Sequence, residues 1–287
     1  MPELPEVETT RRGIAPHLVN KTIARLTLRQ DALRWPVPSH LTDTLPGLVV
    51  WAVNRRSKYL TVTLHQDTGQ PAGTLMIHLG MSGSLRLTDP EVTPRKHDHI
   101  DLTLTDGTCL RYHDPRRFGA WLWTIDPPSQ HPLLRKLGPE PLSDAFQGST
   151  LMAALARRKS AIKTCLMNAQ IVVGVGNIYA NEALFLSGLH PKQPANTLTL
   201  AQCDTLVQHI REVLAKAIEQ GGTTLNDFLS PSGTPGYFEQ QLFVYGRHQA
   251  PCRRCDTPIE KQIINQRASY FCPHCQPDTP LDPSSSC

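Results

Sequence analysis

Residues 252–275 decide the architecture of the C-terminal end, and they read CRRCDTPIEKQIINQRASYFCPHC. Two Cys-x2-Cys pairs, Cys252 with Cys255 and Cys272 with Cys275, are separated by 16 residues. This spacing is typical of a zinc site in which two short turns aim four thiolates at one tetrahedral ion. Four thiolates fill the coordination shell, so we expect one structural zinc ion. Two disulfides are the alternative, but the sequence has no export signal that favours an oxidising compartment.

The chain around these cysteines is basic and contains aromatic residues. Between residues 242 and 275, five Lys and Arg residues stand against two acidic ones, and Tyr245, Tyr270 and Phe271 lie among them. A basic β-ribbon of this kind suits the backbone or a groove of a nucleic acid. A structural clip and a protein-interaction module are the alternatives that this segment leaves open.

Length and composition set wider limits. The chain has 287 residues, a net charge of +4 and 39% hydrophobic residues, which is typical of a globular protein with one large or two ordinary domains. No apolar run approaches the roughly 20 residues of a membrane helix, and the acidic N-terminus does not resemble a signal peptide. We therefore expect a cytoplasmic protein with no membrane partner. The small positive charge supports a polyanionic partner only weakly.

The first half of the chain predicts one helix followed by β structure. Apolar residues recur at helical spacing from Leu4 to Leu18, which predicts an amphipathic helix over 3–20 that Pro16 kinks or ends. Residues 22–125 contain short β-branched or alternating runs separated by turn signals, which indicates an antiparallel sandwich or barrel. The predicted strands are Ile23–Leu28, Val49–Asn54, Leu60–Leu64, Thr74–Leu79, Ile100–Leu104 and Ala120–Trp123.

The second half predicts helices. Five prolines between 126 and 145 indicate a linker, and Gly221-Gly222 ends the last helical pattern. Residues 276–287 have the composition of a disordered tail. The candidate helices are Leu151–Arg158, Ile162–Asn168, Ile178–Ser187 and Leu200–Gln220. Three cysteines outside the zinc pattern are expected in the core: Cys109, Cys165 and Cys203.

Three further motifs have to be considered together with the cysteines: MPELPEVE at residues 1–8, GVGNIYANE at 174–182, and Gln266-Arg267. In this order and spacing they resemble the formamidopyrimidine-DNA glycosylase family, the bacterial base-excision enzymes that remove oxidised purines. The resemblance runs from residue 2 to residue 275. Further matching stretches are HLGMSG at 78–83, KHDH at 96–99, DPRRFG at 114–119 and PGYF at 235–238.

The resemblance implies an α+β fold with an N-terminal helix, an antiparallel β-sandwich, a helix–two-turn–helix domain and a zinc-finger β-hairpin. The implied divisions are a catalytic β-sandwich domain at 1–135, a helical DNA-binding domain at 136–225, a lesion-capping loop with a four-cysteine zinc finger at 226–276, and a disordered tail at 277–287. The implied partner is double-stranded DNA that contains oxidised bases or abasic sites, bound by a monomer.

The resemblance also implies chemistry at the N-terminus. Removal of Met1 would leave Pro2 with a free secondary amine, which attacks the sugar and forms a cationic iminium that promotes β- and δ-elimination. Glu3 is then the general acid/base, and Glu6 positions the terminus. An ordinary helix start is the alternative for Pro2. A carboxylate that favours the helix dipole is the alternative for Glu6.

A base stacked in a duplex must be flipped out before it can be excised. The resemblance assigns phosphate contacts to Lys58, Asn177 and Arg267, with Lys58 and Arg267 also taking part in catalysis. Met81, Arg116 and Phe118 match the residues that fill the vacated space, although Met81 and Phe118 read alone would be expected in the core. His78 and His97 match residues that contact the DNA backbone. Thr223, Thr224 and Tyr237 belong to the stretch that matches the lesion-capping loop.

Three other functions remain to be weighed. A sister family that resembles endonuclease VIII shares Pro2, Glu3 and the zinc finger but prefers oxidised pyrimidines. The DPRRFG stretch and the 223–228 segment favour the purine branch. A catalytically silent protein that binds damaged DNA would use the same contacts. A metal-dependent nuclease would need a carboxylate cluster, and the sequence offers no such spacing.

Overall fold

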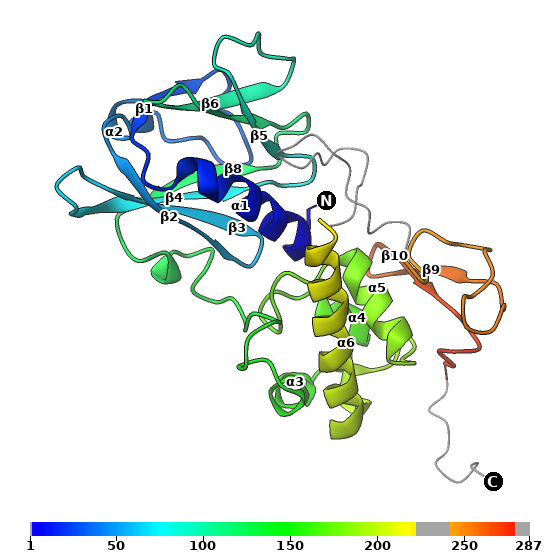
Figure 1. Ribbon diagram of the computed structural model, residues 1–287. Helices are drawn as coiled ribbons and strands as arrows, with labels where there is room; N and C mark the ends of the chain where they lie inside the picture. The colour runs from blue at the N-terminus through cyan, green and yellow to red at the C-terminus, as the bar shows by residue number, and fades with distance from the viewer. Residues whose placement is uncertain (1, 222–241, 279–287) are drawn as a thin grey trace, which may run out of the picture. The chain divides into compact units, whose positions relative to one another are not determined.

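The computed structural model describes residues 2–221 and 242–278 (Figure 1). These residues form two compact units: residues 2–136 and 217–221 form the first, and residues 137–216 and 242–278 form the second. Within the described ranges no helix combines the length and the apolar character that crossing a membrane requires.

The predicted N-terminal helix is confirmed as α1 (Leu4–Leu18). Glu3 is its N-cap, and Pro5 lies in the first turn, where a missing N–H leaves no hydrogen bond unmade. Pro16 lies inside the last turn, so the helix ends two residues beyond it at Leu18. The buried face carries the apolar residues that predicted the helix, including Val7 and Ile14.

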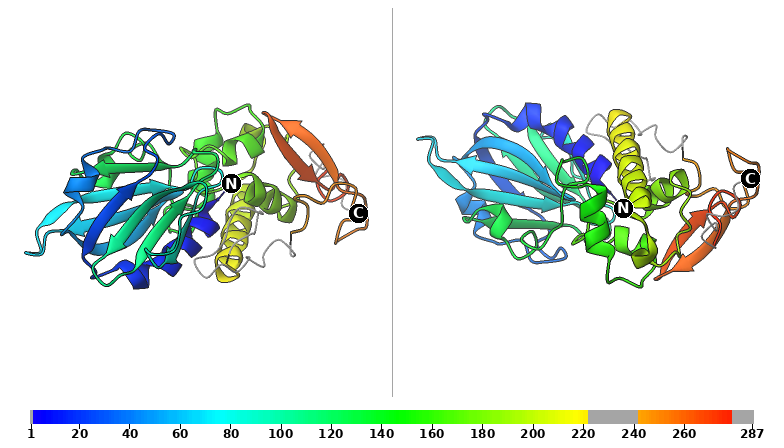
Figure 2. Two further views of the ribbon diagram at one scale, coloured as in Figure 1. Left: turned by 90° about the horizontal axis from the view of Figure 1, so that it is seen from above. Right: turned by 90° about the horizontal axis from the view of Figure 1, so that it is seen from below.

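The β structure is a sandwich of two four-stranded antiparallel sheets (Figure 2). One sheet has the order β2-β3-β4-β8 and the other the order β1-β6-β7-β5. All six predicted strands are present, and the structure adds β5 and β7. The bounds are β1 Ile23–Leu28, β2 Val49–Arg56, β3 Tyr59–His65, β4 Pro71–His78, β5 Ser84–Thr88, β6 Asp98–Leu104, β7 Cys109–His113 and β8 Ala120–Thr124.

One hydrophobic core lies between the two sheets and extends to α1, which contacts β2 and β3. Val50, Leu75 and Leu102 are fully buried in it, together with Trp121. Burial of a Val or Leu side chain contributes about 1.5–3 kcal/mol, so this core supplies most of the stability of the unit. A short helix, α2 (Leu41–Thr44), and a 3-10 turn, η1 (Pro128–Gln130), lie in connecting segments.

The second unit contains the four predicted helices with small shifts at their ends. They are α3 (Gly148–Leu155), α4 (Ile162–Leu166), α5 (Asn177–Leu186) and α6 (Leu200–Glu219), with a 3-10 turn, η2 (Ala195–Thr197), before α6. The zinc-pattern segment forms a two-stranded hairpin of β9 (Glu260–Ile264) and β10 (Arg267–Phe271). Its small core contains Phe185 of α5, Val244 and Ile259. Cys109, Cys165 and Cys203 are buried, as predicted.

Candidate functional site

The N-terminal residues hold two buried carboxylates next to Pro2. The backbone N–H of Glu3 donates a 2.8 Å hydrogen bond to a carboxylate oxygen of Glu6, and the Glu3 side chain accepts from the Glu6 backbone N–H in return. Both glutamates are 2% exposed, and Pro2 is buried. This reciprocal pair caps α1 and fixes the backbone of the residue that follows Pro2.

Lys58 and His78 lie at the same end of one sheet, Lys58 in the turn before β3 and His78 at the end of the neighbouring strand β4. Lys58 occupies the tight turn from β2 to β3, where Ser57 has a positive φ of 56°. Tyr59, the next residue, pairs with His78 on β4, and the two rings lie 4.7 Å apart. Burial and the charge of Lys58 lower the pKa of His78 to about 4. The Nδ1 atom of His78 accepts from the Gly80 N–H at 2.9 Å, so the neutral ring presents Nε2–H as a donor.

Met81, Arg116 and Phe118 lie on two loops that line one cavity of about 690 Å³, together with Arg34 and His78. The Arg116 guanidinium stacks 4.8 Å from the centre of the Phe118 ring. Phe118 is 44% exposed, so the core position expected from its type alone is wrong. Met81 is half-buried. An exposed aromatic ring and a cation on one loop, with Met81 on the neighbouring loop, can replace the stacking and pairing of a missing base.

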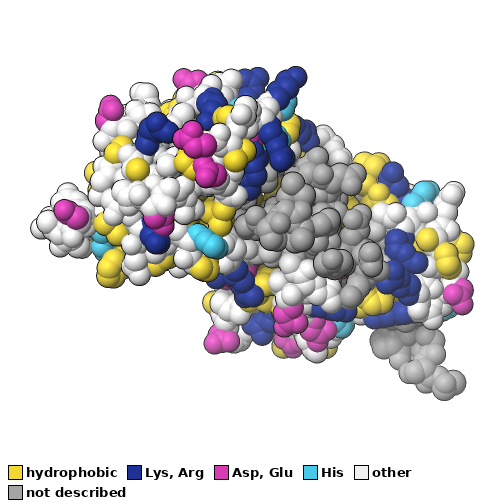
Figure 3. Space-filling model, turned by 45° about the horizontal axis from the view of Figure 1, so that its top comes forward, with side chains coloured by type: hydrophobic (Ala, Val, Ile, Leu, Met, Phe, Trp, Pro, Cys, Tyr) yellow, Lys and Arg dark blue, Asp and Glu magenta, His cyan; other side chains and the backbone are white. Residues whose placement is uncertain are grey.

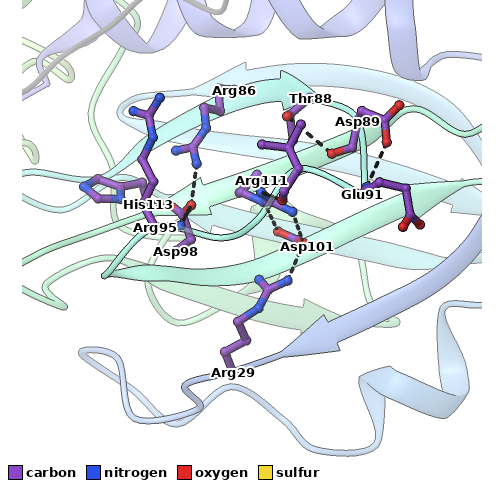
Figure 4. A network of polar contacts seen from close by, with 11 residues as sticks. Arg29, Arg86, Thr88, Asp89, Glu91, Arg95, Asp98, Asp101, Arg111 and His113 are labelled. Carbon is purple, nitrogen blue, oxygen red and sulfur yellow. Dashed lines mark hydrogen bonds and ion pairs between the residues drawn. The ribbon is translucent and has the colours of Figure 1, made fainter.

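His97 lies in a strained turn beside a buried ion-pair network. Its φ is 75°, and its pKa is lowered by desolvation and by the charge of Lys96. Asp98, the next residue, binds Arg86 and accepts from Nδ1 of His113 at 2.8 Å (Figure 4). These bonds fix the end of the segment that carries His97.

A second carboxylate holds the same sheet together (Figure 4). Asp101 accepts from Arg111 at 2.8 Å and from Arg29 at 2.6 Å, and the two guanidiniums lower its pKa to about 2 against the cost of burial. Arg111 is fully buried and also donates to the Val92 carbonyl at 2.7 Å. The loop that precedes His97 is therefore anchored to the sheet beneath it.

In the second unit, Asn177 at the start of α5 contacts the zinc hairpin. Its Nδ2 donates a 3.0 Å hydrogen bond to the carbonyl of Ala268, the residue after Arg267. Lys163, which is 1% exposed, donates to the same carbonyl at 2.8 Å and to Ser269 Oγ at 2.6 Å. Asn177 therefore binds the backbone of Ala268, the residue next to Arg267, so the two residues predicted to contact phosphate are linked through Ala268.

Two further buried residues of α5 hold the segment before and within the finger. Both carboxylate oxygens of Glu182 accept backbone N–H bonds, at 2.7–3.0 Å, from three successive residues that begin at Phe243. Burial raises the pKa of Glu182 although these donors oppose the shift. Asn181 accepts from the Tyr270 N–H at 2.9 Å. Sequence reasoning missed Lys163, Asn181 and Glu182 as partners, although the last two stand in the GVGNIYANE motif.

A cavity of about 380 Å³ lies beside the hairpin and is lined by cationic and polar residues. Lys163 and Arg267 line it together with Arg158 and Asn168. Figure 3 shows Lys and Arg side chains gathered in clusters on the surface of each unit. Sequence reasoning did not single out Arg158, although the Arg157-Arg158-Lys159 run marks a basic turn.

The four predicted zinc ligands come together at the base of the hairpin. Their sulfur atoms lie within 4.8 Å of one another, with separations of 3.9 Å for Cys252–Cys275 and 3.5 Å for Cys255–Cys272. Zinc–sulfur bonds of about 2.3 Å in a tetrahedron place the sulfurs about 3.8 Å apart, so the donor set fits this ion. The described cysteines form no disulfide.

Thr223, Thr224 and Tyr237 lie outside the described residues, as do Met1 and the end of the tail. The structure therefore brings together Glu3 with Glu6, the Met81–Arg116–Phe118 group with His78, and Asn177 with the hairpin of Arg267.

Three models of known protein families match successive parts of the chain. Residues 1–121 match the formamidopyrimidine-DNA glycosylase N-terminal domain, 137–228 match the H2TH domain of the same enzyme, and 250–277 match the zinc finger found in FPG and IleRS. The formamidopyrimidine-DNA glycosylase of Hydrogenovibrio crunogenus is 59% identical over 276 residues, which are 96% of both chains. That of Methylococcus capsulatus is 55% identical and matches over its whole length and 96% of this chain.

The chain belongs to the formamidopyrimidine-DNA glycosylase family. Solved structures of the family agree with the fold: the MutM (Fpg) protein of Thermus thermophilus has a TM-score of 0.85 at 38% identity, covering 97% of this chain and 100% of the other. A Lactococcus lactis FPG mutant in complex with DNA containing Fapy-dG has a TM-score of 0.87 at 32% identity, covering 96% and 100%. The family assignment makes the chain a DNA glycosylase and confirms the α+β fold and a zinc finger able to hold one structural ion.

Proposed function

We propose that the chain is a bifunctional DNA glycosylase and abasic-site lyase that excises oxidised purines, namely 8-oxoguanine and formamidopyrimidines. The observation that carries the proposal is the arrangement at the N-terminus, where Pro2 directly precedes Glu3, and the buried carboxylates of Glu3 and Glu6 each accept from the backbone N–H of the other residue. A nucleophile needs a general acid or base within reach, and Glu3 is adjacent to it in the chain.

The proposed reaction begins when the unprotonated amine of Pro2 attacks C1′ of the damaged nucleotide. A terminal amine titrates near 8, so a useful fraction is neutral at pH 7. The glycosidic bond breaks and the base leaves with its electron pair. Glu3 takes the N–H proton from the attacking nitrogen and delivers it to the sugar ring oxygen, while the departing base takes a proton from solvent. The ring then opens, and the nitrogen lone pair that the lost proton leaves behind forms the iminium. A secondary amine leaves no N–H on this iminium, so the cation persists as an electron sink.

Strand scission then follows from the iminium. Loss of a proton from C2′ expels the 3′ phosphate, and a second elimination expels the 5′ phosphate. Water finally hydrolyses the iminium and frees Pro2. Glu6 supports these steps by holding the backbone of Glu3 through the 2.8 Å hydrogen bond.

Contacts to DNA are assigned to residues in both units. Lys58, His78 and His97 of the first unit and Asn177 and Arg267 of the second contact phosphates. Lys58 and Arg267 also take part in catalysis. The neutral His78 suits this role because its Nε2–H is a donor and phosphate oxygens are acceptors. Met81, Arg116 and Phe118 fill the space of the extruded base, as their exposed cation and ring allow.

The purine preference is supported by the relatives. Structures of the Lactococcus lactis protein are described as complexes with DNA containing Fapy-dG, an abasic site, or an oxidised pyrimidine. The last of these keeps an oxidised-pyrimidine glycosylase as the second candidate. We also propose that the protein acts as a cytoplasmic monomer, that its domains divide at 135, 225 and 276, and that Thr223, Thr224 and Tyr237 cap the lesion.

Borohydride trapping across a panel of lesions tests the proposal. The purified protein is incubated with duplexes that carry 8-oxoguanine, a formamidopyrimidine or an oxidised pyrimidine, and borohydride reduces any iminium to a stable amine. We expect fastest trapping with the two purine lesions, and no effect of EDTA on the rate over the assay time. Fastest trapping with the pyrimidine would favour the second candidate. Binding of the lesion without any covalent adduct would instead indicate a protein that binds damaged DNA but does not catalyse its excision.

A further inference from the structure

Asp114 stands at the junction of the segments that carry four of the proposed DNA contacts, and the proposed chemistry gives it no role. It is fully buried. Its carboxylate accepts from Ser82 Oγ at 2.8 Å and from the Gly119 N–H at 2.9 Å. Ser82 follows Met81, and Gly119 follows Phe118. One carboxylate therefore joins the two loops that line the 690 Å³ cavity.

The same residue fixes the remaining members of the group. The Arg116 N–H donates to the carboxylate at 3.3 Å, and the Tyr112 hydroxyl donates at 2.9 Å. The backbone N–H of Asp114 donates to the His97 carbonyl at 3.0 Å, and its carbonyl accepts from His99 Nε2 at 2.8 Å. Asp114 thus connects the loops of Met81, Arg116 and Phe118 to the turn of His97.

Close packing makes the two loops one body. Gly80 has a φ of +66°, and a Cβ on it would lie 2.4 Å from the carbonyl carbon of Phe118. A Cβ on Gly119 would lie 1.7 Å from the Tyr112 hydroxyl. Because Gly80 packs against the backbone of Phe118 and Gly119 packs against the Tyr112 side chain, a shift of one loop must be followed by the other. The hydrogen bonds to the Asp114 carboxylate fix the position of one loop relative to the other.

We propose that Asp114 is a positioning residue that holds the Met81–Arg116–Phe118 group in register before DNA arrives. The inference rests on the proposed function of that group. Only a carboxylate serves here, because Oδ1 faces the Ser82 hydroxyl and the Arg116 N–H while Oδ2 faces Tyr112 and the Gly119 N–H. An amide in either orientation would place an N–H against one of these backbone N–H groups.

Asp114→Asn tests the proposal by comparing two activities of one protein. Filling the vacated space matters only when a base leaves a duplex, so lesion excision from duplex DNA is expected to fall about tenfold or more. Strand scission at an abasic site in single-stranded DNA is expected to change by less than about twofold. An unchanged ratio of the two rates would overturn the proposal.

Two further variants separate positioning from loss of stability. Val50→Ala removes methyl groups from the core of the same unit and should lower the melting temperature without changing the ratio. Ser82→Ala removes a single donor to Asp114 and serves if Asp114→Asn does not fold. It should shift the ratio in the same direction by a smaller factor, and no shift would count against the proposal. Absence of both activities in the unsubstituted protein would instead refute the proposed function.

Discussion

Asn177 is linked to Arg267 through one residue, because the Asn177 amide donates to the carbonyl of Ala268, the neighbour of Arg267, at 3.0 Å. The helix start and the zinc hairpin therefore present their proposed phosphate contacts as one rigid surface. Lys163 of α4 also holds β10 in place, because its ammonium group donates two hydrogen bonds to that strand. Rigid presentation matters because a contact that is already ordered loses less entropy when DNA binds.

Lys163→Met should destabilise the joint between α4 and the hairpin. The substitution keeps the apolar stem but leaves the Ala268 carbonyl and Ser269 with fewer donors, at a cost of about 1.5–3 kcal/mol for lost bonds to a charged group. Urea unfolding measures the change in the free energy of unfolding. Lys159→Met, at an exposed position nearby in the chain, is the matched control. Equal stability of the two variants would contradict the assigned role.

Arg267→Ala should weaken DNA binding evenly across sequences. Arg267 is exposed on the hairpin, and loss of one phosphate contact reduces the slope of log affinity against log salt by about 1. Fluorescence anisotropy over a range of salt concentrations gives the slope. Arg135→Ala removes an equal charge from an exposed position that matches no DNA-contact motif. A slope that falls equally in both variants would show only a general charge effect.

Cys252→Ser should release zinc and lower DNA affinity while Pro2 still forms its covalent intermediate, and scission should slow because the finger carries Arg267. Three thiolates bind the ion less tightly than four, and the small finger core around Cys252 depends on it. Zinc content by atomic absorption and scission of single-stranded abasic DNA are measured together. Cys203→Ser, at a buried cysteine outside the cluster, should retain zinc. Normal DNA affinity in the zinc-free protein would show that the zinc finger does not contribute to DNA binding.

In His78→Gln the free energy of unfolding should fall less than in the parent protein as the pH is lowered. The pKa of His78 is about 4 in the folded protein, because of burial and nearby positive charge, against about 6.5 when unfolded. The unfolded state therefore takes up the proton first as the pH falls, and stability present above pH 6.5 is lost between about 6.5 and 4. The component is of the order of 3 kcal/mol.

Urea unfolding at several pH values isolates this component as the difference between the variant and the parent protein. His40→Gln, the same substitution at an exposed position, is the matched control. If the stability of the parent and of His78→Gln fell in parallel as the pH drops, the pKa of His78 would be the same in the folded and unfolded states, which would contradict the lowered pKa.

Local spacing predicted those features whose partners lie close in the chain. The four cysteines lie within one hairpin, and α1 follows from its periodic apolar face, so both were accessible from sequence. The residue type of Phe118 did not indicate its exposure, because an aromatic residue ordinarily favours the core. Only the resemblance of the DPRRFG stretch pointed to an exposed role, and the structure shows the residue 44% exposed.

Buried charges were equally hidden. Lys163 meets its partners 105 and 106 residues away, and Glu182 meets its partners 61 to 63 residues away. Only the fold brings such groups together. β7 shows the same limit, since it carries Arg111, a cation that is fully buried because Asp101 on the neighbouring strand pairs with it. The local sequence around Arg111 does not predict its pairing with Asp101.

The most direct measurement maps the covalent bond itself. Protein with Met1 removed and protein with Met1 retained are each treated with abasic DNA and borohydride, then digested and analysed by mass spectrometry. We expect an adduct on the nitrogen of Pro2 in the processed protein, and neither adduct nor strand scission in the form whose Pro2 nitrogen is bound in an amide. Full turnover by the Met1-retaining form, or an adduct on a lysine alone, would contradict the account.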